Sequence, residues 1–405
     1  MLIKSLHLKN ILSFKDTRLD LQPLNVLIGA NGSGKSNLID VIAMLQAVPV
    51  DLPAFFRRSG PTGDWKWKGG DSEAPDVRVS AIQADIHNPE RPDMPLRYDL
   101  LIDASDNSLK VESEWLLDLS PDTGQSRPYF FRGASGDGRA MPSEEAVAIA
   151  ELTGEGIRTQ LSADTIDSAQ SVFSAMRHPF IFPVLSQTAD RLSAIKTYRS
   201  WNVGRNSAVR SPQPTDGVVS FPEEDFNNLA LVVNDLRERQ GLGPTMDKYL
   251  ERFYETYQSL HTPIYGNTVS LTVREAGLSR PLPAPRLSDG TIRFIALLAI
   301  LCHPEPPPLI CIEEPEIAMH PDSLGLIAEL MRKASERTQI IVTTHSPQFV
   351  DLFSDEPDTV IVCERDRHPA DGTQFNRLSR EKLGDWLVDY TLGDAWMRGA
   401  LGGVR

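Results

Sequence analysis

Hydrophobic and polar positions alternate near the start of the chain and then condense into an apolar run. Residues 2–8 and 19–21 have the pattern of half-buried strands, whereas residues 24–28 are continuously apolar, as in a strand buried on both faces. A glycine-rich stretch follows at 29–36, and residues 37–46 carry apolar side chains at helical spacing. This region therefore predicts a buried strand, a glycine-rich loop and a helix, in that order.

The C-terminal third repeats this alternation of strands and helices. Continuous apolar runs predict strands at 309–312, 339–343 and 359–363, and helices are predicted at 292–301 and 323–334. Strands that alternate with helices are typical of a mostly parallel sheet. The predicted fold class is therefore α/β.

The region between these two parts, residues 37–286, has a different character. Most of the chain's 30 prolines lie in it, so no long uninterrupted helix is expected there. The pattern predicts short antiparallel strands at 77–86, 97–103 and 108–117, helices at 144–152, 163–176 and 226–260, and mobile loops at 60–76 and 132–142. We divide the chain into an N-terminal core part (1–50), a β subdomain with a helical insertion (51–285) and a C-terminal core part (286–405).

The composition narrows the class of protein. Of the 405 residues, 40% are hydrophobic and 24% are charged, as in a soluble globular protein. The 55 acidic residues outnumber the 41 basic ones and give a net charge of −14, which argues against a surface broadly adapted to nucleic acid. The three cysteines share no metal-ligand spacing, and no apolar stretch suits a membrane span or a signal peptide. We expect a cytoplasmic, reduced protein with no membrane partner.

The glycine-rich stretch matches the phosphate-binding loop pattern at every position: Gly29, Ala30, Asn31, Gly32, Ser33, Gly34, Lys35 and Ser36. In such a loop the backbone N–H groups converge on phosphate oxygens at the start of a helix. Lys35 is expected to reach the β- and γ-phosphates, and the Ser36 hydroxyl to bind Mg²⁺. The position between a buried strand and an amphipathic helix is the context that the motif requires, so a plain glycine-rich hairpin is the weaker interpretation.

Two further predicted strands end in polar side chains at the same sheet edge. The strand at 309–312 is followed by Glu313 and Glu314; one carboxylate could hold the metal and the other could orient or deprotonate a water molecule. His345 follows the strand at 339–343 and could hydrogen-bond a γ-phosphate. Taken singly, the carboxylates could form a solvated turn and the histidine could cap the next turn.

A short polar segment precedes the apolar helix predicted at 292–301. Ser288 and the backbone at Gly290 could donate hydrogen bonds to phosphate at the start of that helix. Taken alone, Ser288, Asp289 and Gly290 are more typical of a helix N-cap.

In their order along the chain, these four elements resemble the head of ABC-type ATPases, and most closely its RecF/SMC/OLD-like branch. Residues 29–36 are similar to the Walker A motif and 309–314 to Walker B. Residues 287–291 are similar to the signature motif, and His345 to the switch histidine. Residues 8–14 and 314–321 also resemble segments of that branch, so the match covers about 1–46 and 286–365.

Two departures from the family pattern affect the interpretation. Glu313 stands where most ABC proteins have Asp, and the signature lacks the second Gly and the Gln that transporters carry. The glutamine of the Q-loop is not identified by the pattern, and Gln170 and Gln83 are both candidates.

The resemblance implies a P-loop NTPase head with a mixed sheet, an antiparallel β subdomain and an inserted helical subdomain. It implies ATP and Mg²⁺ as ligands, with Asn37 also at the nucleotide, Ser36 and Glu313 at the metal, and Lys35, Glu314 and His345 in catalysis. It also implies a homodimer closed around two ATP molecules, in which Ser288, Asp289 and Gly290 complete the partner's site. The resemblance does not decide whether such dimers assemble into higher oligomers.

The process that the ATPase drives is less well defined. The prolines exclude a long coiled coil, the lack of cysteine in 37–286 excludes a zinc hook, and the tail is too short for an OLD-type nuclease domain. We expect action in DNA repair or anti-phage defence with a separate nuclease or effector. The alternatives are the nucleotide-binding subunit of a membrane transporter and an ATP-switched scaffold that does not hydrolyse.

One basic segment, residues 191–210, could contact DNA. It has no acidic residue and combines cationic and aromatic side chains that suit phosphate neutralisation and base stacking. These are Arg191, Lys196, Arg199, Arg205 and Arg210, with Tyr198 and Trp201. The alternative is a solvated surface loop paired with the acidic excess elsewhere.

Overall fold

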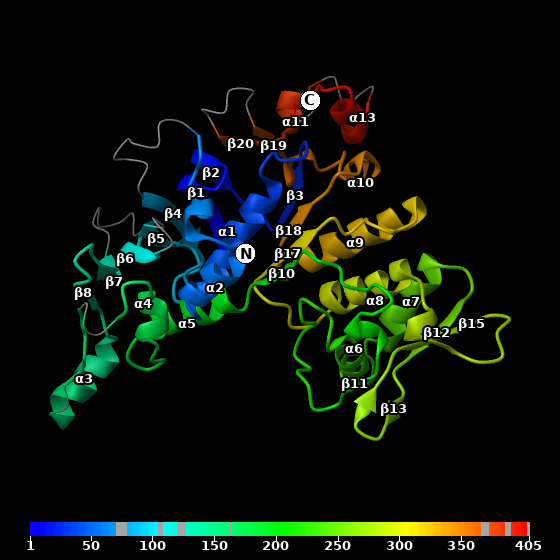
Figure 1. Ribbon diagram of the computed structural model, residues 1–405, viewed down its shortest axis with the longest axis horizontal. Coiled ribbons are helices and arrows are strands. Elements are labelled where there is room, and N and C mark those ends of the chain that lie inside the picture. Colours follow the sequence, from blue (N-terminus) through cyan, green and yellow to red (C-terminus); the bar gives the residue numbers. More distant parts are fainter. Residues whose placement is uncertain are drawn as a thin grey trace.

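The computed structural model describes residues 1–69, 79–103, 108–119, 127–154, 156–162, 164, 166–365, 372–384 and 390–402. A six-stranded sheet runs through the centre of the molecule, with an eight-stranded antiparallel sheet on one side and a group of helices on the other (Figure 1). The C-terminal helices lie at the top of this view. Among the described residues, no helix has the length and apolar character needed to cross a membrane.

The central sheet has the order β10-β17-β18-β3-β19-β20. Its strands are β10 (Lys196–Tyr198), β17 (Leu309–Glu313), β18 (Gln339–Thr343), β3 (Leu24–Ile28), β19 (Val360–Arg365) and β20 (Thr373–Arg377). The first five are parallel and β20 is antiparallel to β19. The parallel sheet and the strands expected at 24–28, 309–312, 339–343 and 359–363 are confirmed, while β10 is a short strand that the sequence pattern did not indicate.

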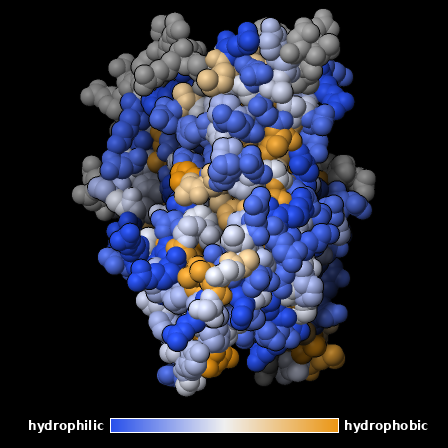
Figure 2. All heavy atoms as spheres, turned by 90° about the vertical axis from the view of Figure 1, so that its right-hand side faces the viewer, coloured by the Kyte–Doolittle hydropathy of each residue, from blue (hydrophilic) through white to orange (hydrophobic). Residues whose placement is uncertain are grey.

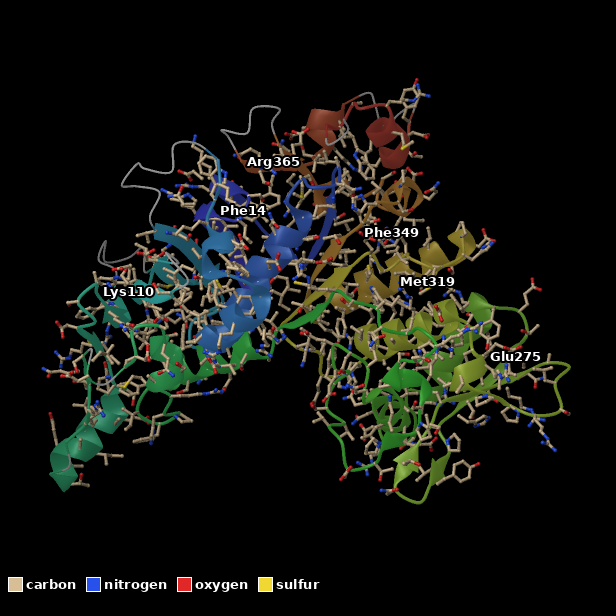
Figure 3. All side chains as sticks on the ribbon, in the orientation of Figure 1. Phe14, Lys110, Glu275, Met319, Phe349 and Arg365 are labelled. Carbon is tan, nitrogen blue, oxygen red and sulfur yellow. The ribbon has the colours of Figure 1, made fainter. Side chains whose placement is uncertain are left out.

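The two faces of this sheet belong to two separate hydrophobic cores, because successive side chains of a strand point to opposite faces. In β3, Val26 packs in one core with the helices α8 (Asp289–Leu301) and α9 (Leu324–Ser335). Leu27 packs in the other core with α1 (Lys35–Ala47). The labelled side chains of Phe349 and Phe14 mark the first and the second core (Figure 3).

The eight-stranded sheet has the order β2-β1-β4-β5-β6-β7-β8-β9 and is antiparallel throughout. Its long strands are β1 (Ile3–Ile11), β2 (Phe14–Asp20), β4 (Val79–Ile86), β5 (Leu96–Asp103), β6 (Lys110–Asp118) and β7 (Arg127–Arg132), and its short ones β8 (Gly138–Ala140) and β9 (Gln160–Leu161). Nearby helices are α2 (Leu52–Ser59), α3 (Glu144–Thr153), α4 (Val172–Ala175) and α5 (Pro183–Ser193). The predicted antiparallel subdomain is therefore present; residues 77 and 78 of its first predicted strand lie outside the described residues.

The helices on the other side carry two small sheets at their outer end (Figure 1). The helices are α6 (Leu229–Glu238) and α7 (Gly243–Phe253), which pack with α8 and α9. The strands are β11 (Gln213–Pro214), β13 (Ile264–Tyr265) and β14 (Thr268–Val269) in one sheet, and β12 (Tyr257–His261), β15 (Thr272–Glu275) and β16 (Leu282–Pro283) in the other. Short helices α10 (Pro347–Asp351), α11 (Arg380–Leu383) and α13 (Leu392–Met397) complete the C-terminal part.

Figure 2 shows the face on the right-hand side of Figure 1. Hydrophilic residues dominate this face, and hydrophobic ones form only small scattered groups within the part that the structure describes. The apolar side chains of the neighbouring helices are instead turned into the core, as the fully buried residues of α8 and α9 show.

Two helix predictions for the middle region are wrong. Residues 226–260 do not form one helix, because the chain turns at Gly241 (φ +69°), where a left-handed conformation ends α6 and Pro244 starts α7, and β12 follows. Of the helix expected at 163–176, the described residues contain only α4, capped by Ser171.

The expected mobile loops are also largely ordered by packing. The loop at 132–142 contains β8 and begins with Arg132, which is 1% exposed and donates to the carbonyl oxygens of Gln170 and Asp167. The loop at 60–76 holds Trp65 and Trp67, both buried, while its residues 70–76 lie outside the described part. Buried indole and guanidinium groups pack these segments against the rest of the protein, although their sequences are rich in Gly and Pro.

Candidate nucleotide-binding site

Two glycines of the phosphate loop stand where no side chain fits. Gly29 has φ +147°, and a Cβ atom there would lie 2.3 Å from the Cys363 carbonyl oxygen. Gly34 has φ +107°, and its Cβ would lie 2.4 Å from Thr373 Oγ1. The loop between β3 and α1 therefore lies directly against β19 and β20, with its backbone in conformations that glycine alone adopts without strain.

Thr373 supports the loop from behind, and sequence reasoning missed it. Its hydroxyl lies 2.8 Å from the Ser33 carbonyl oxygen and 2.8 Å from Ser13 Oγ, and its backbone N–H donates to the Ser13 carbonyl. Thr373 has no motif signal, since it follows the loop by more than 300 positions and reaches it only through the sheet order β3-β19-β20.

The Lys35 side chain lies along the inner side of its own loop. It is 5% exposed, and its Nζ donates to the carbonyl oxygens of Gly29 at 2.8 Å and Ala30 at 3.0 Å. Burial lowers the pKa of Lys35, and the negative charges of Glu314 and Glu313 act in the opposite direction. Ser36, Asn31 and Gly32 are exposed on the open side of the loop, with Ala30 and Asn37 half-buried.

The two carboxylates and the histidine stand at the ends of neighbouring strands. Glu313, the last residue of β17, is in register with Thr343, the last residue of β18. Glu314 has φ +46° and donates its N–H to the Thr343 carbonyl at 2.9 Å. Its Oε1 lies 3.7 Å from His345 Nε2. Burial lowers the pKa of His345, and the charge of Lys35 adds to this effect, so the ring is neutral at pH 7.

These residues meet because β17, β18 and β3 are adjacent and parallel. The carboxyl ends of parallel strands lie at one sheet edge, which places Glu313, His345 and the phosphate loop together. The sequence interpretation expected this convergence, and the described structure has it.

Glu316 ties the two strand ends to each other and was not singled out from the sequence. Its Oε1 accepts hydrogen bonds from Thr344 Oγ1 and from the backbone N–H of His345, the latter at 3.2 Å. Its Oε2 is buried without a hydrogen-bond partner. Burial therefore raises the pKa of Glu316.

Ser288 caps helix α8, as its sequence context indicated. Its Oγ accepts the Thr291 N–H at 3.0 Å, and both Ser288 and Asp289 are exposed. Gly290 lies under the loop that follows β17, since a Cβ atom there would be 2.6 Å from the Ala318 carbonyl oxygen. The backbone at Gly290 is therefore packed against the protein, while the side chains of Ser288 and Asp289 are exposed to solvent.

The family model described as "AAA domain, putative AbiEii toxin, Type IV TA system" matches residues 24–351. The chain belongs to this AAA-domain family. The match includes the phosphate loop, both strand ends and the middle region, to which no motif had been assigned. A comparison with curated protein sequences finds no match.

Two solved structures of Smc head domains share the fold of this AAA-domain chain. One, bound to the C-winged helix domain of ScpA, has a TM-score of 0.55 at 16% identity, over 94% of this chain and 99% of the other. The other has an extended coiled coil and is bound to the C-terminal domain of ScpA derived from Pyrococcus furiosus; its TM-score is 0.52 at 14% identity, over 96% and 98% of the two chains. The predicted α/β fold, that of an SMC-type P-loop head, is confirmed.

The residues of the AAA-domain chain suit a magnesium nucleotide in kind and number. Mg²⁺ in such sites takes one or two protein ligands and completes its shell with phosphate and water. Among the described residues no group of three or more His, Cys, Asp or Glu side chains could hold a metal by itself. Ser36, exposed at the start of α1, and Glu313, at the end of β17, are the side chains that would hold such an ion. Burial raises the pKa of Glu313, against the opposing effect of Arg199.

The basic segment at 191–210 is only partly available at the surface as a candidate DNA contact. Arg210 is 4% exposed and donates to the carbonyl oxygens of Ala284 and Leu287, and Tyr198 is 1% exposed. Arg199 is paired with Asp40 and Glu313. Arg210 and Tyr198 are thus buried, whereas Arg199 and Arg205 are exposed, so the segment presents no continuous row of cations and aromatic rings.

The two candidate Q-loop glutamines are also misplaced. Gln83 lies in β4 and donates to Asp99 at 2.7 Å, and Gln170 lies in a turn before α4, where its carbonyl oxygen accepts from Arg132, so both belong to the antiparallel part. The strand beside β17 is β10, and Arg199 directly follows it. In the AAA-domain chain an arginine thus stands next to Glu313.

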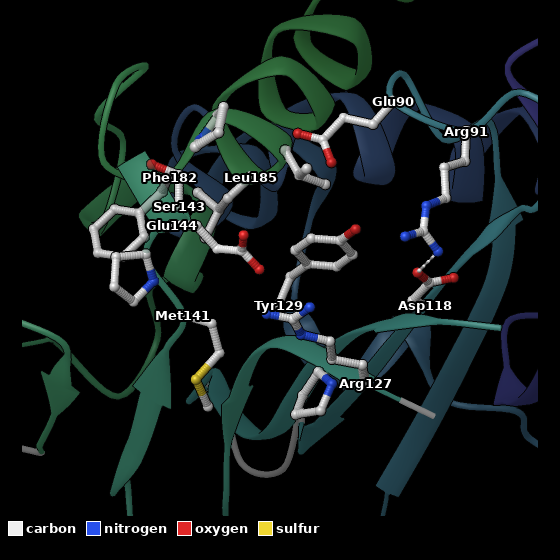
Figure 4. A pocket seen from close by; sticks show the side chains of 14 residues that line it. Glu90, Arg91, Asp118, Arg127, Tyr129, Met141, Ser143, Glu144, Phe182 and Leu185 are labelled. Carbon is white, nitrogen blue, oxygen red and sulfur yellow. Dashed lines mark hydrogen bonds and ion pairs between the residues drawn. The ribbon is translucent and has the colours of Figure 1, made fainter. Parts of the chain in front are cut away.

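A cavity of about 400 Å³ lies in the antiparallel part, away from the phosphate loop. Figure 4 shows Glu90, Asp118, Tyr129 and Glu144 around it, with Arg91 paired to Asp118 at 3.4 Å. None of the residues at the carboxyl edge of the parallel sheet lines it.

Proposed function

We propose that this AAA-domain protein hydrolyses ATP and that two copies close around two ATP molecules. The observation that carries the proposal is the meeting of Lys35, Glu314 and His345 at one edge of three adjacent parallel strands. The unit that would bind the nucleotide comprises residues 1–50 and 286–405 together with β10, which comes from within the 51–285 region. Residues 51–285 otherwise supply the helical insertion and most of the β subdomain, to which the N-terminal part adds β1 and β2.

The phosphate loop supplies binding. Residues 29–34 offer backbone N–H groups, and Lys35 exchanges the carbonyl oxygens of Gly29 and Ala30 for the β- and γ-phosphates. Asn37 lies next to the loop in the first turn of α1. Ser36 and Glu313 would hold Mg²⁺, which neutralises phosphate charge. The partial burial of Lys35 strengthens these contacts because nearby charges are less screened.

Glu314 and His345 supply the proton chemistry. The Glu314 carboxylate orients the attacking water and accepts its proton, as a base within hydrogen-bond reach can. The neutral His345 ring, 3.7 Å from that carboxylate, donates a hydrogen bond to the terminal phosphate. Glu316 positions His345 through its backbone N–H.

The second copy is needed because Ser288 and Asp289 are exposed at the start of α8. Ser288 caps this helix through Thr291, and its exposed hydroxyl could also contact a phosphate held by another chain. A two-fold arrangement then gives two equivalent sites. Hydrolysis removes the γ-phosphate contacts and releases the dimer.

The family description favours a role in defence. It refers to the AbiEii toxin of a Type IV toxin–antitoxin system, and we propose that this chain acts in anti-phage defence with a separate effector, such as a nuclease. DNA repair remains the second context. Both Smc heads are bound to ScpA domains, and a comparable protein partner is proposed here. Recovery of a partner with Glu314→Gln and ATP, but not with Lys35→Ala, would support it.

The experiment that tests the ATPase proposal is the trapping of a dimer. Glu314→Gln should bind ATP without hydrolysis and become dimeric in light scattering with ATP and Mg²⁺. A second change, Ser288→Arg, should restore the monomer while leaving ATP binding intact. A Glu314→Gln variant that stays monomeric with saturating ATP would refute the sandwich. Phosphate release by the unmodified protein separates an ATPase from a scaffold that only binds ATP.

A further inference from the structure

The guanidinium of Arg199 links the helix of the phosphate loop to the Glu313 carboxylate. Its Nε donates to Glu313 Oε1 at 2.9 Å, and its terminal nitrogen contacts Asp40 Oδ1 in α1. About a third of the Arg199 side chain is exposed, whereas Asp40 and Glu313 are more buried. The arginine therefore stands at the open side of the site with its charge turned inward.

The position of Asp40 relates this ion pair to the expected metal site. Asp40 follows Ser36 by four residues in α1, so the two side chains lie on the same face of the helix. Arg199 thus bridges the two elements, α1 and β17, that carry the oxygens expected to bind Mg²⁺. A cation in the chain itself neutralises these carboxylates.

We propose that Arg199 is a built-in counter-cation that competes with Mg²⁺ for Glu313, so that loading of the magnesium nucleotide requires Arg199 to release this carboxylate while Asp40 retains it. The inference rests on the proposed function, because it concerns the same metal and nucleotide. Arg199 thus keeps Mg²⁺ away from Glu313, and no sequence motif identifies this arginine.

A second contact links the displacement of Arg199 to the surface that is expected to form the dimer. Trp201 Nε1 donates to the Glu313 carbonyl oxygen at 2.8 Å, and the Trp201 ring stacks on Phe226. The guanidinium of Arg293, in α8, lies 5.5 Å from the centre of that ring and donates to the Ile317 carbonyl. Displacement of Arg199 therefore acts through Trp201 on α8, whose first turn carries Ser288.

The test uses Arg199→Gln, with Arg205→Gln as a control that removes the same charge from an exposed position in the same segment. Binding of a non-hydrolysable ATP analogue is followed by calorimetry over a range of Mg²⁺ concentrations. Arg199→Gln should lower the Mg²⁺ concentration at half-maximal binding about tenfold, or about 1.4 kcal/mol in metal affinity. Arg205→Gln should leave it unchanged.

Two other variants protect the test against a folding defect. Arg199→Lys keeps the charge and should stay close to the unmodified protein. Asp40→Asn removes the competing anchor, leaves Arg199 to Glu313 alone, and should raise the Mg²⁺ concentration required. A change in analogue affinity at every Mg²⁺ concentration, with the same Mg²⁺ midpoint, would reduce Arg199 to a structural contact and overturn the inference.

The outcome also separates this inference from the proposed function. If the unmodified protein bound no analogue at any Mg²⁺ concentration, the ATPase proposal would fail. If it bound the analogue and Arg199→Gln shifted no midpoint, only the role of Arg199 would fail. Thermal unfolding without nucleotide gives an independent reading: Mg²⁺ alone should stabilise Arg199→Gln more than the unmodified protein, since its two carboxylates lack their cation.

Discussion

The Glu316 carboxylate accepts the backbone N–H of His345 at 3.2 Å, so the chain after β17 is tied to the chain after β18. The same oxygen accepts the Thr344 hydroxyl, and the other oxygen is buried without a partner. This contact sets the spacing between Glu314, two residues before Glu316, and His345. A single carboxylate thereby aligns the two groups expected to handle the proton.

Replacing Glu316 should show this alignment. Glu316→Ala leaves the Thr344 hydroxyl and the His345 N–H without an acceptor, which should cost about 1–3 kcal/mol of unfolding free energy and lower ATP turnover. Glu316→Gln keeps a carbonyl acceptor and removes a charge that burial disfavours, so it should be as stable as the unmodified protein or more so. Urea unfolding and phosphate release measure both, and equal behaviour of the two variants would contradict the role.

The phosphate loop offers a matched pair of glycines. Gly34 and Gly32 both have positive φ, but a Cβ at Gly34 would meet Thr373 Oγ1 at 2.4 Å, whereas nothing lies within 4 Å of one at Gly32. Gly32→Ala should therefore cost only the backbone strain, about 1–2 kcal/mol. Gly34→Ala should in addition push the loop off β20 and weaken nucleotide binding by more than tenfold in calorimetry. Similar affinities for the two variants would show that contact with Thr373 does not shape the loop.

Much of this site could be predicted because its parts are local. Glu313 ends an apolar strand, His345 follows one by two residues and Lys35 follows one across the glycine loop, and a strand that ends in a polar side chain marks the rim of a parallel sheet. The parts that were missed act across long sequence separations. Arg199 follows a strand of three residues, and Thr373 reaches the loop only because β20 pairs with β19.

The errors in the middle region have a similar origin. Residues 226–260 contain enough apolar side chains for one helix, but the turn at Gly241 separates α6 from α7, and the extended Tyr254 ends α7 before the strand β12. The basic segment suggested a DNA-binding surface because charge in a sequence does not show which side chains are buried. Arg210 was expected to face DNA, but its donors satisfy carbonyl groups inside the fold.

Arg210 should prove structural, with an effect on dimer formation. It donates to the carbonyls of Val203, Ala284 and Leu287 and contacts Asp289, so it fixes the segment that leads into α8. Arg210→Ala should lower the unfolding free energy by roughly 2–5 kcal/mol, because these buried acceptors lose their donor. ATP-dependent dimerisation, measured by light scattering in the Glu314→Gln background, should weaken more than ATP binding does.

Arg205→Ala is the control for this prediction, since Arg205 is exposed in the same segment. It should change neither unfolding nor dimerisation. An Arg210→Ala protein that unfolded normally and bound DNA more weakly than the unmodified protein would restore the nucleic-acid interpretation of the segment.

The stability of the folded protein should decrease below neutral pH because His303 is buried. His303 is 7% exposed, lies edge-on to Phe221 and accepts the Glu305 N–H through Nδ1. Burial lowers the pKa of His303 below its ordinary value of 6.5. The unfolded chain therefore takes up the proton first as the pH falls, so stability is complete above about pH 6.5 and decreases below it.

A matched pair of substitutions isolates this effect. His320 accepts the Asp322 N–H through Nδ1 in the same local geometry, but its side chain is 76% exposed. Asparagine can keep the acceptor at either position without titrating near neutral pH. His303→Asn should reduce the drop in thermal unfolding temperature between pH 7.5 and 5.5, and His320→Asn should leave that drop unchanged. If both variants kept the full drop, the pH dependence would have to come from other groups, and His303 would not contribute to it.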